Sequence, residues 1–356
     1  MGAASTRGHG TVPRTALVEA VARFPRVPLA MLPTPLVEAP RLSAALRGPT
    51  IWLKREDLAG LGLGGSKYRI LEFTLGDAVA GGADVVIASG MAQSNHPQQV
   101  VSAACHLGIP AIVLLGGVEG RVGWTGNMLL EGLSGAEVHV LPSAGFDELR
   151  VAQEVLADRL RARGRRPALV TLTRDVHLRG VIAYVAYVAE LAQQLEDHGL
   201  EVAALYVASG GPTYAGMALG AIATGAAFDV IGVSPLGRAA DCTRHVTGLI
   251  EEAARLLELD LTLDPGRVHV TDAYLGPGHG ITTPEAVAAI KLTAASEGVF
   301  LDPVYSGKAM AALIDHIGKG ELQPTQAVVF AQTGGVPALF AYAKELMPEP
   351  CSAVET

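Results

Sequence analysis

Short, continuous apolar runs alternate with longer amphipathic stretches along most of the chain. Runs such as ADVVIAS, PAIVLLGG and QAVVFAQ are typical of strands that are buried on both faces of a parallel sheet. Between them, a stretch such as FDELRVAQEVLADRLRARG carries apolar residues at helical spacing and ends in arginines and a glycine. This regular alternation predicts a doubly wound α/β architecture.

The same pattern predicts a long helix from Val181 to Leu195 and further strands in TIWLKRED, AEVHVLP, PALVTLT, VAALYVAS, AFDVIGVSP and RVHVTDAY. Five prolines between Pro25 and Pro40 predict an extended, irregular segment. The parallel strands fall into two groups, so we expect two α/β domains. The large domain would comprise residues 1–75 and 176–356, and the small domain residues 76–175.

Composition narrows the class of protein. Of the 356 residues, 49% are hydrophobic and 17% charged, which indicates a well-packed enzyme body and not a disordered chain. The net charge of -8 gives no reason to expect a nucleic-acid partner. No apolar run reaches the length of about 18 residues that a membrane span needs. Residues 1–12 lack the apolar core of a secretory signal, and we expect a flexible tail there.

The three cysteines, Cys105, Cys242 and Cys351, are widely scattered and show no metal-ligand spacing. Such sparse use of cysteine favours a reducing cytoplasm over a disulfide-linked protein, and it predicts no metal site.

Three glycines precede Lys67 in the stretch GLGGSKYRILE, where an apolar helical run begins. Glycines let the backbone bend tightly and approach a bound group, and they leave the first helical N–H groups free for an anion. A lysine amine that is desolvated to its neutral form can attack a carbonyl. Taken alone, the stretch is more simply a glycine-rich turn with an exposed lysine.

Two further turns between a strand and a helix carry groups that suit anions. The loop SGGPTYAG, residues 209–216, offers backbone N–H groups and a positive helix end to a phosphate, although plain connections of this kind are common. Ser94, Asn95 and His96 could surround a carboxylate, or could simply cap the following helix. His96 could also change charge near neutral pH.

Five motifs in order, IWLKREDLAGLGLGGSKYRILEF, SGMAQSNHPQQV, ASGGPTYAG, EGVFLDPVYSGKAM and FAQTGGVPALFAY, resemble the D-cysteine desulfhydrase and 1-aminocyclopropane-1-carboxylate (ACC) deaminase family. The resemblance runs from about Phe24 to about Ala343. These enzymes use pyridoxal 5'-phosphate (PLP) and have the tryptophan-synthase-β fold. The resemblance therefore implies that the cofactor lies between the two domains, attached to Lys67, and that the freed Lys67 amine then acts at the substrate Cα.

The resemblance also implies roles for other residues. Tyr305 and Ser94 would join Lys67 in catalysis, and Asn127 would hydrogen-bond the ring oxygen O3′. The cofactor would contact Asn95, Asn127, Gly211, Pro212, Thr213, Tyr214, Ala215, Gly216, Ser306 and Thr333. The substrate would contact Ser94, Asn95, His96, His279 and Tyr305.

Several departures from the family pattern bear on the substrate. ACC deaminases have glutamate at the position of Ser306, near the pyridine nitrogen, and leucine at the position of Thr333. A neutral hydroxyl holds a ring proton less firmly than a carboxylate does, so we expect a milder electron sink that suffices for β-elimination. His279 replaces a family tyrosine, Ser66 replaces an asparagine, and Pro212 removes one N–H donor from the phosphate loop.

We therefore expect a cytoplasmic, PLP-dependent lyase that acts on a small amino acid and yields pyruvate and ammonia. Ring opening of the ACC type, or a β- or γ-replacement, is the alternative on the same cofactor. A non-catalytic relative that binds PLP or an amino acid as a sensor is the alternative from another class. By analogy with the family we expect a homodimer without membrane association.

Overall fold

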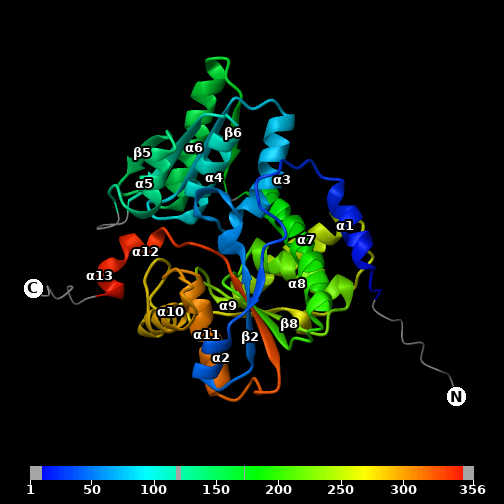
Figure 1. Cartoon of the computed structure of the whole chain (residues 1–356). Helices are drawn as coiled ribbons and strands as arrows, with labels where there is room; N and C mark the ends of the chain where they lie inside the picture. The colour runs from blue at the N-terminus through cyan, green and yellow to red at the C-terminus, as the bar shows by residue number, and fades with distance from the viewer. Residues whose placement is uncertain (1–9, 118–121, 172, 348–356) are drawn as a thin grey trace, which may run out of the picture.

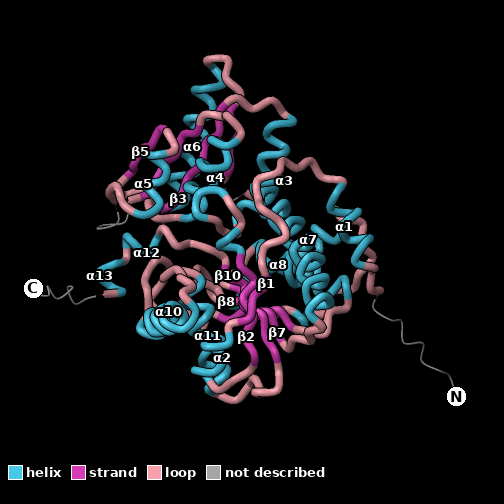
Figure 2. Tube along the Cα trace, viewed as in Figure 1, coloured by secondary structure: helices cyan, strands magenta, loops and turns pink. Residues whose placement is uncertain are grey.

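The structure, a computed structural model, describes residues 10–117, 122–171 and 173–347. Two separate sheets form the molecule, and helices cover both faces of each (Figures 1 and 2). Most of the predicted tail, residues 1–9, and Cys351 lie outside the described residues. Within the described part, no helix has both the length and the apolar character that crossing a membrane requires.

The larger sheet has six strands in the order β1-β2-β10-β7-β8-β9. Its strands are β1 (Leu36–Glu38), β2 (Thr50–Arg55), β7 (Ala204–Val207), β8 (Asp229–Val233), β9 (His269–Thr271) and β10 (Ala327–Gln332). All neighbouring strands are parallel except the edge pair of β1 and β2, which is antiparallel. The doubly wound α/β prediction is confirmed, and the short edge strand β1 is an addition within the proline-rich segment.

The smaller sheet has four parallel strands in the order β5-β4-β3-β6. Its strands are β3 (Val85–Met91), β4 (Ala111–Gly116), β5 (Glu137–Leu141) and β6 (Pro167–Val170). All four lie inside the predicted small domain, and all strands of the larger sheet lie outside it. The domain limits at 75 and 175 themselves stay a prediction.

The helices fill the connections between strands. They are α1 (Arg14–Ala22), α2 (Pro40–Leu46), α3 (Lys67–Ala80), α4 (Asn95–His106), α5 (Gly126–Leu133), α6 (Phe146–Ala162), α7 (Arg174–His198), α8 (Pro212–Thr224), α9 (Ala239–Leu256), α10 (Pro284–Glu297), α11 (Ser306–Gly318), α12 (Ala338–Ala341) and α13 (Ala343–Leu346). Short 3₁₀ turns are η1 (Glu56–Leu58), η2 (Leu61–Leu63) and η3 (Pro265–Arg267).

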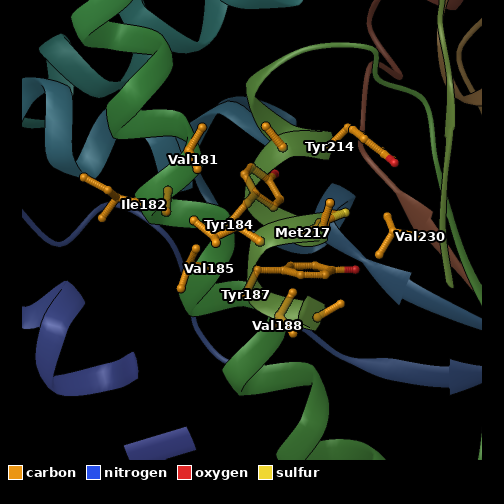
Figure 3. Close-up of a cluster of buried hydrophobic side chains, with 14 of the residues drawn as sticks. Val181, Ile182, Tyr184, Val185, Tyr187, Val188, Tyr214, Met217 and Val230 are labelled. Carbon is orange, nitrogen blue, oxygen red and sulfur yellow. The ribbon is translucent and has the colours of Figure 1, made fainter. Parts of the chain in front are cut away.

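The longest helix, α7, begins earlier than the pattern predicted. Thr173 caps it by accepting a hydrogen bond from the backbone N–H of Val176. Gly180, taken from the sequence as the point before the helix, lies inside it, where an added Cβ would be 3.0 Å from Cβ of Pro212 in α8. Glycine here serves close helix packing. Figure 3 shows Tyr184 and Tyr187 of α7 directed toward α8 in the same buried cluster.

Helix α3, which begins at Lys67, belongs to the cores of both domains. Ile70 and Phe73 pack with α7 in the core of the large domain. Tyr68, Leu71 and Leu75 pack instead with α4 and the small sheet. The helix that carries the lysine therefore lies between the two sheets (Figure 1), because its apolar residues cover two faces instead of one.

Candidate active site

Several helices begin where strands of the two parallel sheets end, and their first residues lie close together. An added Cβ on Gly335, after β10, would lie 2.7 Å from Cβ of Asp302 and 2.8 Å from Nδ2 of Asn95. Asn95 begins α4 of the small domain, and Asp302 precedes α11 of the large domain. The carboxyl edge of parallel sheets, lined by helix N-termini, is where α/β proteins bind ligands.

The glycine-rich loop before Lys67 is held by close backbone contacts. Gly65 has a φ of +125°, and an added Cβ would lie 2.4 Å from Nε2 of Gln99. Gly334 has a φ of +90°, and an added Cβ there would lie 2.6 Å from the Cα atom of Gly65. Both positions therefore require glycine, for conformation and for space. The backbone N–H of Lys67 donates to Oε1 of Gln99 at 3.0 Å, which fixes the start of α3.

The Lys67 side chain is half-buried, and its amine lies 3.4 Å from Oγ of Ser66. Burial lowers the pKa of Lys67, and the negative charge of Asp302 opposes that shift. Tyr184 donates its hydroxyl hydrogen to the carbonyl of Ser66 at 2.9 Å, so α7 also fixes the backbone beside the lysine. A partly desolvated, firmly placed amine is what attack on an aldehyde requires.

The small domain contributes Ser94 and Asn95. Oγ of Ser94 accepts the backbone N–H of His96 at 3.3 Å, so Ser94 caps α4 and keeps its own hydroxyl hydrogen for another acceptor. Nδ2 of Asn127 donates to the carbonyl of Gln93 and to Oδ1 of Asn95, both at 2.8 Å. Both hydrogens of Asn127 are therefore used within the protein, and the residue orients Asn95. The expected hydrogen bond of Asn127 with the ring oxygen O3′ stays a prediction.

The His96 side chain points into the small domain. Its Nε2 donates to the carbonyl of Val170 at 3.2 Å, which fixes the tautomer because a carbonyl can only accept. Burial lowers the pKa of His96 to about 4, and the nearby charge of Lys67 acts in the same direction. The imidazole is therefore neutral at neutral pH, although histidine at this position could have titrated there. Its backbone N–H remains the group that can face a substrate.

The second glycine loop lies next to the first turn of α3. An added Cβ on Gly180 would lie 3.0 Å from Pro212 and 3.4 Å from Cδ1 of Ile70, so the start of α8 neighbours the Lys67 helix. An added Cβ on Gly211 would meet nothing within 4 Å. Oγ of Ser209 accepts from the backbone N–H groups of Gly211 and Tyr214 at 3.1 and 3.3 Å. The loop thus has open space and N–H groups that already converge on one oxygen.

The remaining loop residues are less suited to phosphate. The N–H of Ala215 donates to the carbonyl of Gly211 within the first helical turn. Gly216 lies where α8 crosses α7, and an added Cβ would be 2.4 Å from Cβ of Tyr184, so packing alone requires glycine there. The Tyr214 hydroxyl accepts the N–H of His269 and lies away from the loop. Thr213 is buried in the first turn of α8, and its contact with the cofactor stays a prediction.

At the start of α11, Ser306 and Asp302 form a closed pair of hydrogen bonds. Oγ of Ser306 donates to Oδ1 of Asp302 at 2.6 Å and accepts the N–H of Asp302 at 2.7 Å. The carboxylate also accepts the backbone N–H groups of Val304, Tyr305 and Ser306 at 2.7–3.0 Å. Asp302 is fully buried, and burial raises its pKa while these hydrogen bonds oppose the rise.

Tyr305 and His279 form the large-domain wall of the site. Their rings meet edge to face, with centroids 5.7 Å apart. Burial raises the pKa of Tyr305, so its phenol keeps the proton at neutral pH and can act as a donor. Nδ1 of His279 donates to the carbonyl of Pro235 at 3.2 Å, and burial lowers the pKa of His279. His279 is therefore neutral, with Nε2 as an acceptor.

Thr333 follows β10, and its carbonyl accepts the N–H of Ser66 at 2.9 Å. This bond connects the end of β10 to the lysine loop. The motifs in the sequence do not predict the contributions of Asp302, Gln99 and Tyr184. Only Asp302 had a usable signal, because an aspartate shortly before a helix commonly caps it.

The residues present fit PLP. A half-buried amine with a lowered pKa lies at the start of α3, and the glycine loop at Gly211, near that helix, has open space. Oδ1 of Asn127 is buried and has no hydrogen-bond partner among the described residues, a sign of an unfilled polar position. A separate cavity of about 340 Å³ lies among α1, α3 and α7, and no predicted site residue lines it.

Comparison with known proteins identifies the family. The family model described as "Pyridoxal-phosphate dependent enzyme" matches residues 27–334. D-cysteine desulfhydrase of Klebsiella pneumoniae (strain 342) is 39% identical over 331 residues, covering 90% of this chain and 97% of the relative. The enzyme of the same name from Salmonella newport (strain SL254) is 38% identical over 328 residues, with the same coverage.

Among solved structures, an "ACC deaminase homologue" superposes with a TM-score of 0.84 at 35% identity, covering 94% of this chain and 98% of the other. Threonine deaminase isoform 2 from Solanum lycopersicum has a TM-score of 0.65 at 18% identity, covers 98% of this chain and 92% of that one, and supports the fold alone. From the family match, the identities and the shared fold, the chain belongs to the family of pyridoxal-phosphate-dependent enzymes.

Proposed function

We propose that the protein is a PLP-dependent lyase that eliminates the β-substituent of a small amino acid and releases pyruvate and ammonia. The observation that carries the proposal is Lys67 itself, a half-buried lysine whose pKa is lowered by burial and whose preceding loop is fixed by the close contact of Gly65 and Gly334. The identity of 38–39% to D-cysteine desulfhydrases supports elimination of a thiolate from a cysteine-like substrate.

The residues divide into a base and an acid. Bound PLP supplies the electron sink that makes the substrate Cα proton removable. The Lys67 amine, whose pKa is lowered by burial, takes that proton. The Tyr305 phenol, whose pKa is raised by burial, holds a proton that it can donate to the departing group. Opposite pKa shifts are typical of the base and the acid in one active site.

Substrate orientation would come from the small domain. The Ser94 hydroxyl hydrogen and the backbone N–H of His96 would bind the carboxylate at the start of α4, where the helix end favours an anion. The amide of Asn95, which Asn127 orients, would bind the ring oxygen O3′ of the cofactor. His279 would border the β-substituent as a neutral acceptor, and the N–H groups that converge on Ser209 would bind the phosphate.

The cofactor assignment is tested by reconstituting the purified protein with PLP and recording its absorption. We expect a visible band in the wild type that borohydride reduction abolishes, while the reduced cofactor stays covalently attached to Lys67. Lys67→Ala should lack the adduct, whereas Lys291→Ala, a change at an exposed lysine on α10, should keep it. Labelling of a different lysine would contradict the proposal.

The reaction is tested with D-cysteine, L-cysteate, β-chloro-D-alanine and ACC, by assaying ammonia and keto acid. Turnover of the β-substituted alanines supports elimination. Turnover of ACC alone, which would yield 2-oxobutanoate, supports the ring-opening alternative that the solved ACC deaminase homologue raises. Bound cofactor with no turnover of any of the four supports a sensor role.

We further propose that the protein acts as a homodimer in the cytoplasm. The scattered cysteines, of which Cys105 and Cys242 are free thiols, support a reducing compartment. Sedimentation velocity should give a species of twice the chain mass of 36.8 kDa. A monomer at micromolar concentration would contradict the dimer.

A further inference from the structure

Lys308 is a buried cation that the proposed reaction does not use. It lies in the first turn of α11, and it is 1% exposed. Its ammonium donates to two backbone carbonyls, that of Leu275 at 2.7 Å and that of Gly278 at 3.1 Å, which lie 33 and 30 residues earlier in the chain. No carboxylate among the described residues pairs with Lys308, so its hydrogen bonds serve the backbone of one distant turn.

That turn belongs to the loop between β9 and α10, which carries His279. Side chains from later in the chain hold the loop on both sides of His279. Lys308 binds the two carbonyls before it, and the Tyr342 hydroxyl donates to the carbonyl of Gly280, the residue after it, at 2.7 Å. Backbone carbonyls inside a protein require donors. The position of the His279 loop therefore depends on groups outside the loop, and Lys308 supplies two of these hydrogen bonds.

Lys308 also lies in the same helical turn as Tyr305, the other member of the large-domain wall. The backbone N–H of Lys308 donates to the carbonyl of Tyr305 at 3.1 Å. The Tyr305 ring meets the His279 ring edge to face, with centroids 5.7 Å apart. One residue is thus joined by its backbone to Tyr305 and by its side chain to the turn directly before His279. The separation of the two rings therefore depends on Lys308.

The charge of Lys308 acts on His279 as well. Burial lowers the pKa of His279, the hydrogen bond with the Pro235 carbonyl raises it, the positive charge of Lys308 lowers it, and the negative charge of Asp302 raises it. Burial also lowers the pKa of Lys308, and the charge of Asp302 opposes that shift. A nearby cation disfavours an imidazolium. Both the position and the neutral state of His279 therefore depend on Lys308.

We propose that Lys308 is a positioning residue that holds the turn before His279 and thereby sets how large a β-substituent the site accepts. The inference rests on the proposed function, in which His279 borders that substituent. Without the ammonium, the carbonyls of Leu275 and Gly278 lose their donors, and the His279 loop moves away from Tyr305. The site then distinguishes small β-substituents from larger ones less well.

The first test compares D-cysteine with S-methyl-D-cysteine, which differ by one methyl group on the leaving sulfur, as substrates of the protein reconstituted with PLP. Lys308→Met removes the donors and the charge and keeps an unbranched side chain. The ratio of kcat/KM for the smaller to the larger substrate should fall by about threefold to tenfold in this variant. Lys308→Arg, which keeps the charge and the donors, should restore most of the wild-type ratio. An unchanged ratio in Lys308→Met overturns the inference.

The second test follows the His279 imidazole by NMR titration of protein labelled with ¹⁵N-histidine, and His279→Gln assigns its resonance. We expect His279 to titrate at a higher pH in Lys308→Met than in the wild type, because both the nearby charge and the enclosed position are lost. A loss of stability alone does not move this titration. Where Lys308→Met does not fold, Lys308→Gln decides, since its amide can donate to one carbonyl but carries no charge. An unchanged titration of His279 overturns the inference.

Lys319→Met is the matched control. Lys319 is exposed at the end of the same helix and pairs with Asp315 at 2.6 Å. This variant should keep both the wild-type substrate ratio and the wild-type titration of His279, and changes as large as those in Lys308→Met would overturn the inference. A wild type that turns over neither amino acid would contradict the proposed function, whereas the NMR titration would still decide whether Lys308 positions His279.

Discussion

Gly334 and Gly65 meet backbone to backbone beside Lys67, and this contact makes a sharp test at the scale of single residues. Gly334→Ala would place a Cβ 2.6 Å from the Cα atom of Gly65, at a φ of +90°. We expect a loss of about 2–4 kcal/mol in unfolding free energy, from strain and overpacking together, and weaker PLP uptake. Urea unfolding and equilibrium dialysis measure the two effects.

Gly320→Ala is the matched control. Its φ is +73°, and an added Cβ would meet nothing within 4 Å, so only the backbone strain of about 1 kcal/mol applies. PLP uptake should be unchanged. Equal losses in the two variants would mean that the contact with Gly65 contributes nothing.

His96 predicts how stability depends on pH. Burial lowers its folded-state pKa to about 4 from 6.5, so the unfolded chain binds more protons between these values. Stability is therefore lost as the pH falls from about 6.5 to 4, by up to about 3 kcal/mol. In His96→Gln the amide can still donate to Val170 but does not titrate. Urea unfolding from pH 7 to pH 4 should show a smaller loss, and parallel curves would contradict this.

A buried ion cluster joins three elements around the Lys67 helix. Glu190 of α7 accepts from Lys54 of β2 and, at 2.8 Å, from Arg69 of α3, which also pairs with Glu56 at 2.6 Å. The side chains of Lys54, Glu56 and Arg69 are at most 3% exposed. Removing Glu190 would leave two buried cations with only Glu56 to offset them.

Glu190→Ala should therefore lower the free energy of unfolding by about 3–5 kcal/mol, as expected for a broken buried ion pair. The comparison is Arg150→Ala, which breaks the exposed pair of Arg150 and Glu154 on α6 and should cost at most about 0.5 kcal/mol. Thermal and urea unfolding measure both. Similar costs for the two changes would show that the cluster is not a structural link between β2, α3 and α7.

At the scale of elements, hydrophobic periodicity predicted helices and strands correctly where the element packs in a single core. The apolar runs gave β3, β4 and β10 directly, and α6 ends near its arginines and glycine as expected. Periodicity failed where contacts between distant segments determine whether an element forms or where it begins. The three-residue strand β1 exists only by pairing with β2, and the start of α7 was missed because Gly180, a packing residue, looked like a boundary.

Prediction of the site from the sequence has the same limit: residue types are predicted, but their partners are not. The motifs predicted Lys67 and Ser306, because an amine and a hydroxyl are side-chain groups that can react or form hydrogen bonds in a site. The side-chain partners that set their properties come from afar or from the opposite face of a turn, and spacing alone does not reveal them. Asn127 donates one amide hydrogen to Asn95 and the other to the carbonyl of Gln93, and the Ser306 hydroxyl gives its hydrogen to Asp302. The directions of these hydrogen bonds, and hence what each side chain can do, can be read only from the folded structure.

At the scale of the whole molecule, one aromatic contact crosses from the small domain to the large one at the site. Phe146, the first residue of α6, lies with its ring centroid 6.4 Å from that of His279, which in turn meets Tyr305. Phe146 is half exposed, and its contact with His279 spans the two domains. We expect this contact to help hold the domains together in a closed arrangement beside the predicted substrate wall.

Phe146→Ala should weaken this closed arrangement by about 0.5–1.5 kcal/mol, the range for an aromatic pair. The expected result is a rise in KM for β-chloro-D-alanine of about twofold to tenfold with a smaller change in kcat, because closure favours the bound substrate. Val155→Ala, at an exposed position on the same helix, should leave both constants unchanged. A fall in kcat at constant KM would instead place Phe146 in the chemical step, and identical kinetics would exclude it from closure.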